Sequence, residues 1–457
     1  MTDGMVLFDS GELEIAIATY NRCEFVAEWL DKCYEQARER NIVISIWDSS
    51  TNDDTENYIH SFKLQKGDAS MEYHRADSET HLGYKPMLPL LYSTSKYVWV
   101  SGDTRYPDFE MLDRTVFPVL KKDIDYVVLG CIKNEENDGR IYTDKEQFLR
   151  DCFVSITCLG LSIYKTALFE PLKSDKELRE ICDSKYKDNY AFGWIGYFLE
   201  MFFLKEYKAF FSFLPIVNIK PDKKVPSWFS RYYHCWIEDL CNLLDALSDK
   251  YHCTDRVIRE TWKYLAHDLP TLCCAARKSG DLNYDTYKKY RDNGMLARCT
   301  PYGERLKAFA CASDEELDSV LEQEQAIEKK EFEVLCRQKI EEIKTLSECC
   351  QGGLYLYGAG KGGQILAECL AEHGIIVRGI LDKEAQAGWL CCNLPVLRPG
   401  DVSLDNCLVV ISLLTWQPFI VSSLVDQGVE RSHIYYIYVA DSCEKNAPVL
   451  SGRSEYR

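Results

Sequence analysis

Three short polar segments, each following an apolar run, hold the residues best suited to chemistry in this 457-residue chain. They start at Thr19, Asp48 and Asp103. Ligands of α/β proteins bind in the crevice beyond the carboxyl ends of the strands, where segments of this kind lie. A carboxylate at a strand end can accept a hydrogen bond from a base N–H or a ribose hydroxyl. The segments therefore favour a nucleotide pocket, and the alternative for Asp48 is a plain helix-capping loop.

The apolar runs before these segments are expected to be strands of one sheet. Residues 13–19 and 42–47 are nearly continuous in small and apolar side chains, as in strands buried on both faces. Between them, apolar residues at helical spacing predict a helix to about Arg40. Strand, helix and strand imply a right-handed parallel crossover. With a further strand at 97–100, the three polar segments should meet at one edge of the sheet.

The polar segments resemble three successive signatures of the family-2-type nucleotide-sugar glycosyltransferases. The matching segments are residues 18–22, 47–55 and 97–105, and the resemblance covers about residues 12–220. It implies an α/β fold class with an N-terminal GT-A domain, the Rossmann-like fold of nucleotide-diphospho-sugar transferases. It also implies a glycosyltransferase of the hexosyltransferase type. Such an enzyme transfers a sugar from a nucleoside diphosphate, expected to be UDP, to a glycan or lipid-linked saccharide acceptor with inversion.

The resemblance assigns nucleotide-sugar binding to residues of these segments and of the stretch 81–85. Asp48 would bind the uracil or the ribose, and Lys85 would reach the diphosphate. Gly83 would allow a close approach of the backbone, because glycine has no side chain. The implied binding residues are Thr19, Tyr20, Arg22, Asp48, Ser50, Lys85, Gly102, Asp103 and Arg105.

Asp103 occupies the first place of the family's Asp-rich motif, where a divalent ion bridges the protein and the diphosphate. The second acid is missing, because Thr104 and Arg105 follow and the next acid is Asp108. A lone carboxylate holds Mg²⁺ or Mn²⁺ only with help from waters and substrate phosphates. Two alternatives follow. Asp103 binds Mn²⁺ or Mg²⁺ with help from Asp108 or the diphosphate, or Arg105 neutralises the diphosphate itself as a bidentate guanidinium.

Sugar transfer also needs a base for the acceptor hydroxyl. The family places an acid for this purpose in its acceptor half, which corresponds to residues 181–190 of this chain. Asp188 and Asp183 are the candidate catalytic residues, and the alternative is that each is a solvated acid outside the site. Residues 153–164 are expected to be strands around a turn, which would form the floor beneath the acceptor.

The chain is expected to have three parts, with boundaries near residues 225 and 348. A GT-A-like domain (1–225) precedes a helical region (226–348), and a Rossmann-like accessory domain (349–457) follows. In the helical region, Ser313 and Glu316 form a capping box, from which a long acidic helix should run to about Thr345. This helix is either a connector on the first domain or one arm of a homodimer.

The last part carries a glycine-rich sequence between a predicted strand and a predicted helix. Gly358, Gly360 and Gly363 have the G-x-G-x-x-G spacing, and Asp382 closes the next strand. This is the context of a dinucleotide fingerprint, so an NAD-type dinucleotide is a candidate cofactor. The domain resembles small Rossmann-like modules attached to sugar-modifying and capsule-assembly proteins. The alternative is a docking or regulatory module in which the glycines pack helix on strand.

Composition limits the partners and the compartment. The net charge of −18 argues against nucleic acid as the main partner, because phosphate binding needs a basic surface. The 21 cysteines include no Cys-x-x-Cys pair and no secretory signal is evident, so we expect reduced thiols in a cytoplasmic protein. Residues 191–217 read as a core helix followed by a buried strand. Their alternative is an aromatic face that touches the inner face of a membrane.

Two other functions remain open from the sequence. The first is an NAD-linked sugar-nucleotide oxidoreductase, whose activity would lie in the last domain. The second is a non-catalytic scaffold that binds a sugar nucleotide, suggested by the missing second acid at Thr104. We expect glycosyl transfer in polysaccharide biosynthesis, with the acceptor resting on family analogy alone.

Overall fold

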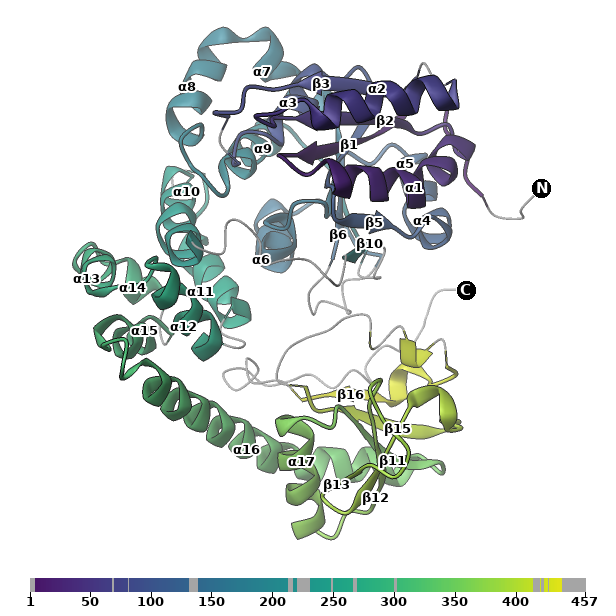
Figure 1. Cartoon of the computed structure of the whole chain (residues 1–457), viewed down its shortest axis with the longest axis vertical. Helices are drawn as coiled ribbons and strands as arrows, with labels where there is room; N and C mark the ends of the chain where they lie inside the picture. The colour runs from purple at the N-terminus through teal and green to yellow at the C-terminus, as the bar shows by residue number, and fades with distance from the viewer. Residues whose placement is uncertain are drawn as a thin grey trace. The chain divides into compact units, whose positions relative to one another are not determined.

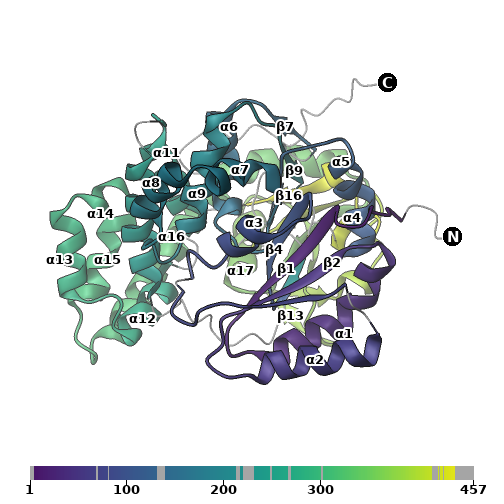
Figure 2. The same cartoon turned by 90° about the horizontal axis from the view of Figure 1, so that it is seen from above.

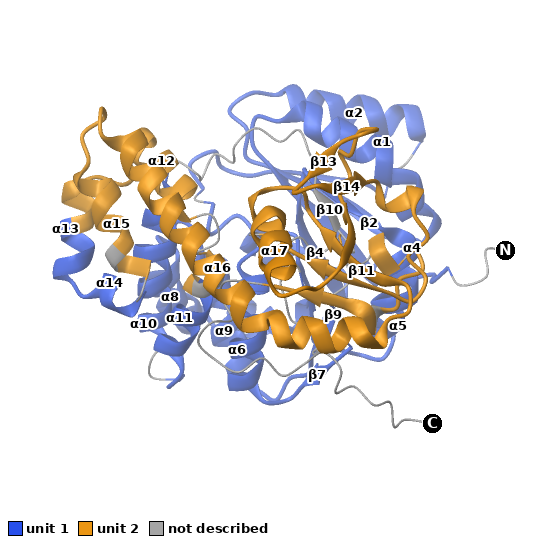
Figure 3. Cartoon of the chain, turned by 90° about the horizontal axis from the view of Figure 1, so that it is seen from below, with its two compact units in different colours: residues 1–261, 288–300 blue, residues 262–287, 301–457 orange. Residues whose placement is uncertain are grey.

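The computed structural model of the chain divides into two compact units (Figures 1 and 3). One unit comprises Met1–Thr261 and Lys288–Thr300, and the other comprises Trp262–Tyr287 and Pro301–Arg457. The residues that the structure describes are 5–67, 70–80, 82–130, 139–212, 217–219, 231–247, 250–265, 269–299, 302–413, 420, 423–425 and 427–437.

The first unit is built on a mixed, mainly parallel sheet of order β3-β2-β1-β4-β8-β6-β9-β7. β1, β2, β3 and β4 run parallel, and β8 runs antiparallel to its neighbours β4 and β6. A short ribbon of β5 and β10 lies outside this sheet. The strands are β1 Leu13–Thr19, β2 Val43–Asp48, β3 Glu72–Arg75, β4 Tyr97–Gly102, β5 Arg105–Pro107, β6 Tyr126–Leu129, β7 Ile141–Tyr142, β8 Ser162–Lys165, β9 Ala209–Ser212 and β10 Val217–Ile219.

Helices α1 and α2 lie beside β1 and β2, as Figure 2 shows. α1 buries Val26, Trp29, Leu30 and Cys33, at the helical spacing that the sequence predicts, in the core beneath the sheet. The helices up to residue 204 are α1 Cys23–Glu39, α2 Asp54–Lys66, α3 Met87–Tyr92, α4 Phe109–Thr115, α5 Phe117–Leu120, α6 Lys145–Ile156, α7 Glu170–Ser174, α8 Lys176–Tyr186 and α9 Gly193–Leu204, with a 3₁₀ turn at Thr166–Phe169.

The expectation of two strands in residues 153–164 was wrong in its first half. The segment up to Ile156 is the end of α6, and only Ser162–Lys165 forms a strand, β8. Asp144 caps α6 by accepting a hydrogen bond from the Gln147 N–H at 3.0 Å. β-Branched residues such as Val154 and Ile156 favour strands, but the cap and the buried face of the helix determine the conformation here. The helix and strand expected in 191–217 are present as α9 and β9.

The middle of the chain is helical, as predicted. A π-helix, His234–Asp239, continues into α10 Leu240–Ala246. Ser313 and Glu316 make the capping box, with the Ser313 N–H 3.0 Å from a Glu316 carboxylate oxygen, and α16 begins one residue later. The boundary expected near 225 lies outside the described residues. The other helices are α11 Thr254–Leu265, α12 Leu269–Ser279, α13 Tyr284–Asp292, α14 Met295–Arg298, α15 Tyr302–Cys311 and α16 Leu317–Cys349.

The second unit contains a smaller sheet of order β13-β14-β12-β11-β15-β16. All its pairings are parallel except that of β13 with β14. Counted along the chain from β11 without β13, the order is 3-2-1-4-5, that of a Rossmann-like sheet. The elements are β11 Gly353–Tyr357, α17 Lys361–Glu372, β12 Val377–Leu381, β13 Leu390–Cys391, β14 Leu394–Leu397, β15 Cys407–Ile411 and β16 Ile434–Tyr436, with 3₁₀ turns at Pro399–Asp401 and Arg431–His433.

The predicted fold class is confirmed. The chain is α/β, with a large N-terminal sheet that is mostly parallel, a helical middle and a small Rossmann-like sheet near the C-terminus. Among the described residues, no helix combines the length and the apolar character needed to cross a bilayer.

Candidate functional site

Strand register brings the three polar segments to one edge of the first sheet. Thr19 at the end of β1 lies opposite Asp48 at the end of β2. On the other side of β1, Ala18 lies opposite Gly102, so Asp103 follows directly beyond the same edge. Because these strands are parallel, their carboxyl ends meet here, which is where open α/β sheets bind ligands. We call this the carboxyl edge of the first sheet.

Asp103 is held by a hydroxyl and a guanidinium. Thr19 donates a hydrogen bond from Oγ1 to Oδ2 of Asp103 at 2.9 Å, and Nη1 of Arg22 lies 3.3 Å from Oδ1. The Asp103 residue is 3% exposed, whereas a third of the Arg22 side chain is exposed. The guanidinium also lies over the Phe25 ring, 4.2 Å from its centroid. Arg22 is therefore a cation whose position depends on Asp103 and whose outer part reaches solvent.

Asp48 is completely buried and organises the turn that follows it. Its Oδ1 accepts hydrogen bonds from the N–H of Ser50, at 2.8 Å, and from the Ser50 hydroxyl. Its Oδ2 accepts from the Tyr73 hydroxyl at 2.9 Å and lies 3.5 Å from Nη1 of Arg75. Both oxygens are thus engaged by the protein, so the carboxylate shapes the pocket edge before any ligand binds.

The segments after β1 and β2 are joined to each other. Asn21 has a positive φ of 51°, a conformation that asparagine tolerates better than most residues. Its N–H donates to the Ser50 hydroxyl at 2.7 Å, and its side-chain oxygen accepts from the Thr51 N–H at 2.9 Å. Hydrogen bonds therefore connect two of the predicted signatures at the carboxyl edge.

Lys85 reaches the carboxyl edge from the segment before α3. Its Nζ lies 4.6 Å from the centroid of the Tyr20 ring, a cation–π contact, and Tyr20 is 44% exposed. Burial lowers the pKa of Lys85, while the negative charge of Asp48 acts in the opposite direction. His81, the first residue of the predicted stretch, lies outside the described residues. The structure thus brings Lys85 to the edge that carries Asp48.

Gly102 and Arg105 differ in what surrounds them. A Cβ on Gly102 would have no atom within 4 Å, so the carboxyl edge is open at this point. Arg105 lies at the start of β5, where its main-chain oxygen accepts a hydrogen bond from Nε1 of Trp29 at 2.7 Å. The stem of its side chain packs against Gly160, whose Cβ position is 3.0 Å from Cγ of Arg105. Arg22, and not Arg105, is the guanidinium paired with Asp103.

Sequence reasoning missed Tyr73 and Arg75 at the end of β3. Arg75 lies 3.5 Å from Asp48 and 3.3 Å from Asp53, and it donates a 2.8 Å hydrogen bond to the main-chain oxygen of Ser50. Burial, as the largest cause, raises the pKa of Tyr73 to about 12. The signal was present, because β3 is the next parallel strand and its carboxyl end must reach the same edge.

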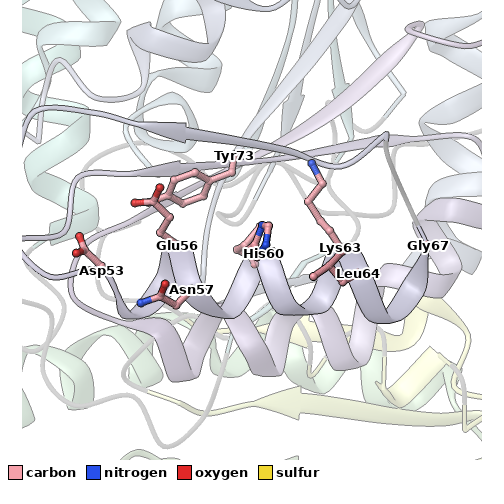
Figure 4. Close-up of a pocket in the computed structure, with 9 residues that line it drawn as sticks. Asp53, Glu56, Asn57, His60, Lys63, Leu64, Gly67 and Tyr73 are labelled. Atoms are coloured by element: carbon pink, nitrogen blue, oxygen red, sulfur yellow. The ribbon is translucent and has the colours of Figure 1, made fainter.

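A depression of about 820 Å³ lies along α2, beside β3 (Figure 4). Asp53, His60, Lys63 and Tyr73 are among the residues that line it. Tyr73 connects it to the carboxyl edge, since the same side chain donates to Asp48. The depression therefore extends the polar surface around Asp48 along the helix.

The two candidate bases lie in different surroundings. Asp183, on α8, accepts a 2.6 Å hydrogen bond from the Tyr197 hydroxyl, which ties it into the packing of α8 and α9. Asp188 is exposed and follows α8. Within the described part of the chain, no hydrogen bond or ion pair connects either acid to Asp48 or Asp103. The main chain next to Asp188 packs on Gly83, because a Cβ on Gly83 would lie 2.1 Å from Asn189 O.

The predicted metal ligand, Asp103, lies among few other oxygen ligands that the described part of the protein could supply. The described residues contain no group of three or more His, Cys, Asp or Glu side chains placed to hold a metal ion. Asp103 is a single carboxylate already engaged by Thr19 and by the positively charged Arg22. A divalent ion prefers several oxygen ligands and is repelled by a neighbouring cation. The donor set at Asp103 does not fit a metal site built by the protein.

The glycine-rich loop of the second unit packs tightly. Gly358 has a φ of 102° and donates from its N–H to Leu381 O at 2.8 Å. A Cβ on Gly363 would lie 1.9 Å from Gly358 O, whereas a Cβ on Gly360 would have no atom within 4 Å. Asp382 accepts a 2.9 Å hydrogen bond from the Ala359 N–H. Most of the motif therefore serves helix-on-strand packing, and dinucleotide binding here remains a prediction.

Comparison with known proteins finds likeness only to solved structures of low identity and low TM-score. No protein-family model matches it, and no curated protein matches its sequence. A mannosyltransferase from Pyrobaculum calidifontis, PcManGT in complex with GDP-Man and Mn2+, is 15% identical, with a TM-score of 0.40 over 68% of this chain and 88% of that chain. S. aureus TarS residues 1–349 is 13% identical, with a TM-score of 0.36 over 65% and 90%.

The same TarS fragment in complex with UDP-GlcNAc is 12% identical, with a TM-score of 0.35 over the same shares of the two chains. At identities and TM-scores this low, the likeness carries no argument about activity.

Proposed function

We propose that the chain is a glycosyltransferase that transfers a sugar from a nucleoside diphosphate, with UDP as the expected carrier, to a glycan or lipid-linked acceptor. One observation carries the proposal. Three polar segments far apart in sequence meet at one carboxyl edge, where Asp48 and Asp103 are buried and the cations Arg22 and Lys85 lie beside them. Buried acids that fix the turns of a pocket, with cations beside them for a diphosphate, suit an activated sugar.

In the proposed reaction the acceptor hydroxyl oxygen attacks the anomeric carbon as the bond to the diphosphate oxygen breaks. The hydroxyl proton passes to a base, and the nucleoside diphosphate leaves with the bonding electron pair. The configuration inverts because the acceptor attacks from the face opposite the leaving group. Negative charge grows on the leaving diphosphate and needs fixed positive charge nearby. Arg22 and Lys85 supply it in this proposal. Because the donor set at Asp103 does not fit a metal, no step is routed through Mn²⁺ or Mg²⁺.

Asp188 and Asp183 remain the proposed bases. The Tyr197 hydroxyl occupies one oxygen of Asp183, whereas Asp188 is exposed, so Asp188 is the better candidate. A cytoplasmic location, association with a membrane surface and a homodimer are further parts of the proposal.

Hydrolysis of UDP-sugars in the absence of acceptor tests the proposal. The wild-type chain should release UDP slowly, and Asp103→Asn should lower the rate about a hundredfold or more, because the neutral amide no longer holds Arg22 by charge. Glu110→Gln is the matched control, since this acid on α4 is largely exposed. Equal rates for the two variants would contradict the assigned role of Asp103. Specific binding of UDP without turnover would favour the non-catalytic scaffold.

A further inference from the structure

The π-helical turn His234–Asp239 ends in a buried carboxyl group that sequence reasoning did not identify. Asp239 is 5% exposed. Its Oδ2 accepts a hydrogen bond from the N–H of Ala191 at 3.2 Å, and its main-chain oxygen accepts one from Nδ2 of Asn189 at 2.8 Å. Oδ1 of Asn189 accepts in turn from the Phe192 N–H at 2.8 Å. Asp239 therefore closes the turn at 189–191. π-helical turns are frequent at functional sites.

The 189–191 turn is packed directly on Gly83. A Cβ on Gly83 would lie 2.1 Å from Asn189 O and 2.8 Å from Tyr190 O, so there is room for glycine alone. The main-chain oxygen of Gly83 also accepts a hydrogen bond from the Trp194 N–H at 2.6 Å. Any displacement of the turn must therefore move the backbone at Gly83.

Gly83 lies two residues before Lys85. Between them, the Tyr84 hydroxyl accepts a 3.0 Å hydrogen bond from Arg179 on α8, so the intervening residue is anchored as well. The Lys85 ammonium is the group that lies over Tyr20 at the carboxyl edge. A continuous series of contacts within the first unit thus runs from Asp239, through the turn and Gly83, to Lys85.

We propose that Asp239 is a positioning residue for the sugar donor: its carboxylate fixes the 189–191 turn and, through Gly83, the Lys85 ammonium that binds the diphosphate. The inference rests on the proposed function and names a regulating group for the same site. Asp239 does not touch the substrate in this account. It acts through the turn, and the ionised form acts best, because hydrogen bonds to a charged acceptor are about twice as strong as neutral ones.

Burial raises the pKa of Asp239 to about 7, against the hydrogen bonds from Ala191 and Tyr190, which lower it. The charged groups that face it are Arg231 and Glu238, and Nε2 of His234 lies 3.8 Å from Oδ1. The other ring nitrogen of His234 lies 3.1 Å from Glu238, which pairs with Lys289 of α13 at 2.7 Å.

On the neighbouring α14, Arg298 is engaged by Asp245 and Asp255, each at 2.8 Å. With a pKa of about 7, the carboxyl group of Asp239 is about half ionised near neutral pH.

The test is UDP binding by the full chain, measured by calorimetric titration from pH 5.5 to 8.5. The ratio of the wild-type affinity for UDP to that of Asp239→Asn should rise about fivefold as the pH passes through 7. This is the increase expected when a hydrogen-bond acceptor changes from neutral to charged. The comparison cancels the titration of the UDP phosphate, which is common to both chains. Asp245→Asn is the matched control, because it removes an exposed carboxylate from α10 a short distance along the chain. It should keep the wild-type profile.

Gly83→Ala provides a second test that leaves Asp239 intact. The added Cβ collides with the turn, so UDP should bind about tenfold more weakly at every pH. Parallel affinity profiles for the wild type and Asp239→Asn, or an equal change in Asp245→Asn, would overturn the inference while leaving UDP binding in place. No UDP binding by any chain at any pH would overturn the proposed function itself.

Discussion

The carboxylate of Asp103 determines, at the residue scale, how positive charge is presented at the carboxyl edge. It holds the Arg22 guanidinium at 3.3 Å and takes a hydroxyl proton from Thr19. Part of the Arg22 side chain stays exposed, which leaves donors free to turn toward an incoming phosphate. The net charge of the Asp103–Arg22 pair is close to zero. Lys85 therefore supplies the positive charge that favours binding of an anion at this edge.

Chelation should therefore have little effect on nucleotide binding. We expect UDP affinity in excess EDTA to stay within about threefold of the value with Mn²⁺, whereas Arg22→Ala should weaken it about tenfold or more. The physical reason is that a lone carboxylate beside a guanidinium is a poor divalent site. Calorimetric titration measures both values. Loss of UDP binding in EDTA, with recovery when Mn²⁺ is added, would contradict this prediction and support the metal site expected from the sequence.

Asp239 should also give the fold a pH dependence of known sign. In the unfolded chain the carboxyl group has its ordinary pKa of 3.8, and in the folded chain the pKa is about 7. Between these values the folded chain holds a proton that the unfolded chain has lost, so raising the pH lowers the free energy of unfolding. The loss is complete above about pH 7 and amounts to at most about 4 kcal/mol, at about 1.4 kcal/mol per pKa unit.

Urea denaturation at pH 5 and pH 8 measures this effect. The wild type should lose stability relative to Asp239→Asn over that interval, and equal shifts in the two chains would refute the assignment. If the wild type does lose stability, the ionised carboxylate stabilises the 189–191 turn but lowers the free energy of unfolding of the whole chain. Function and stability are opposed at this residue, as is common in functional sites.

At the scale of elements, a buried ion pair ties the end of α1 to α4. Nη2 of Arg40 lies 2.7 Å from Oδ2 of Asp113, and both side chains are 7% exposed. The N–H of Val6 donates to the same carboxylate at 3.0 Å. Since α1 follows the first signature and α4 follows the third, this pair helps to keep the two segments on one side of the sheet.

Asp113→Ala should lower the free energy of unfolding by about 3–5 kcal/mol, because it leaves the Arg40 guanidinium buried without a counter-charge. Arg114→Ala is the control, since its side chain is 77% exposed and should change stability by less than about 0.5 kcal/mol. Urea denaturation distinguishes the two. A change below about 1 kcal/mol in Asp113→Ala would show that the pair is dispensable.

The sequence predicted the elements around the carboxyl edge well because their patterns are local. Apolar runs and helical periodicity placed β1, α1, β2 and β4, and parallel order then required Thr19, Asp48 and Asp103 to converge. The error in 153–164 came from β-branched residues inside a capped helix. Asp239 could not be found, because its role depends on a contact with Ala191, which is 48 residues away and lies across a π-helical turn that has no sequence signature.

For the whole molecule, the two units have separate hydrophobic cores. The core of the first unit lies under the sheet that carries the candidate site. The core of the second joins α16, α17 and the small sheet, where Phe332 of α16 packs near Gly362. Each unit can therefore be perturbed through its own core, which separates effects on the carboxyl edge from effects on the Rossmann-like sheet.

Gly363→Ala should lower the thermal stability of the second unit by several degrees, because the new Cβ would lie 1.9 Å from Gly358 O. Gly360→Ala should be tolerated, since no atom lies within 4 Å of its Cβ position. Differential scanning calorimetry should show the shift in one transition, while UDP binding by the first unit stays unchanged. Loss of UDP binding in Gly363→Ala would move the nucleotide site to the second unit and favour the oxidoreductase alternative.

The most direct test of the central claim is calorimetric titration of the full chain with UDP, beside Arg22→Ala and Lys85→Ala. Saturable binding of one UDP per chain is expected, weakened about tenfold or more by each substitution through loss of a charge-assisted contact. Arg38→Ala, which removes a mostly exposed cation from the last turn of α1, should match the wild type. Absence of UDP binding, or equal affinity in all four chains, would contradict a nucleotide-sugar site at this edge.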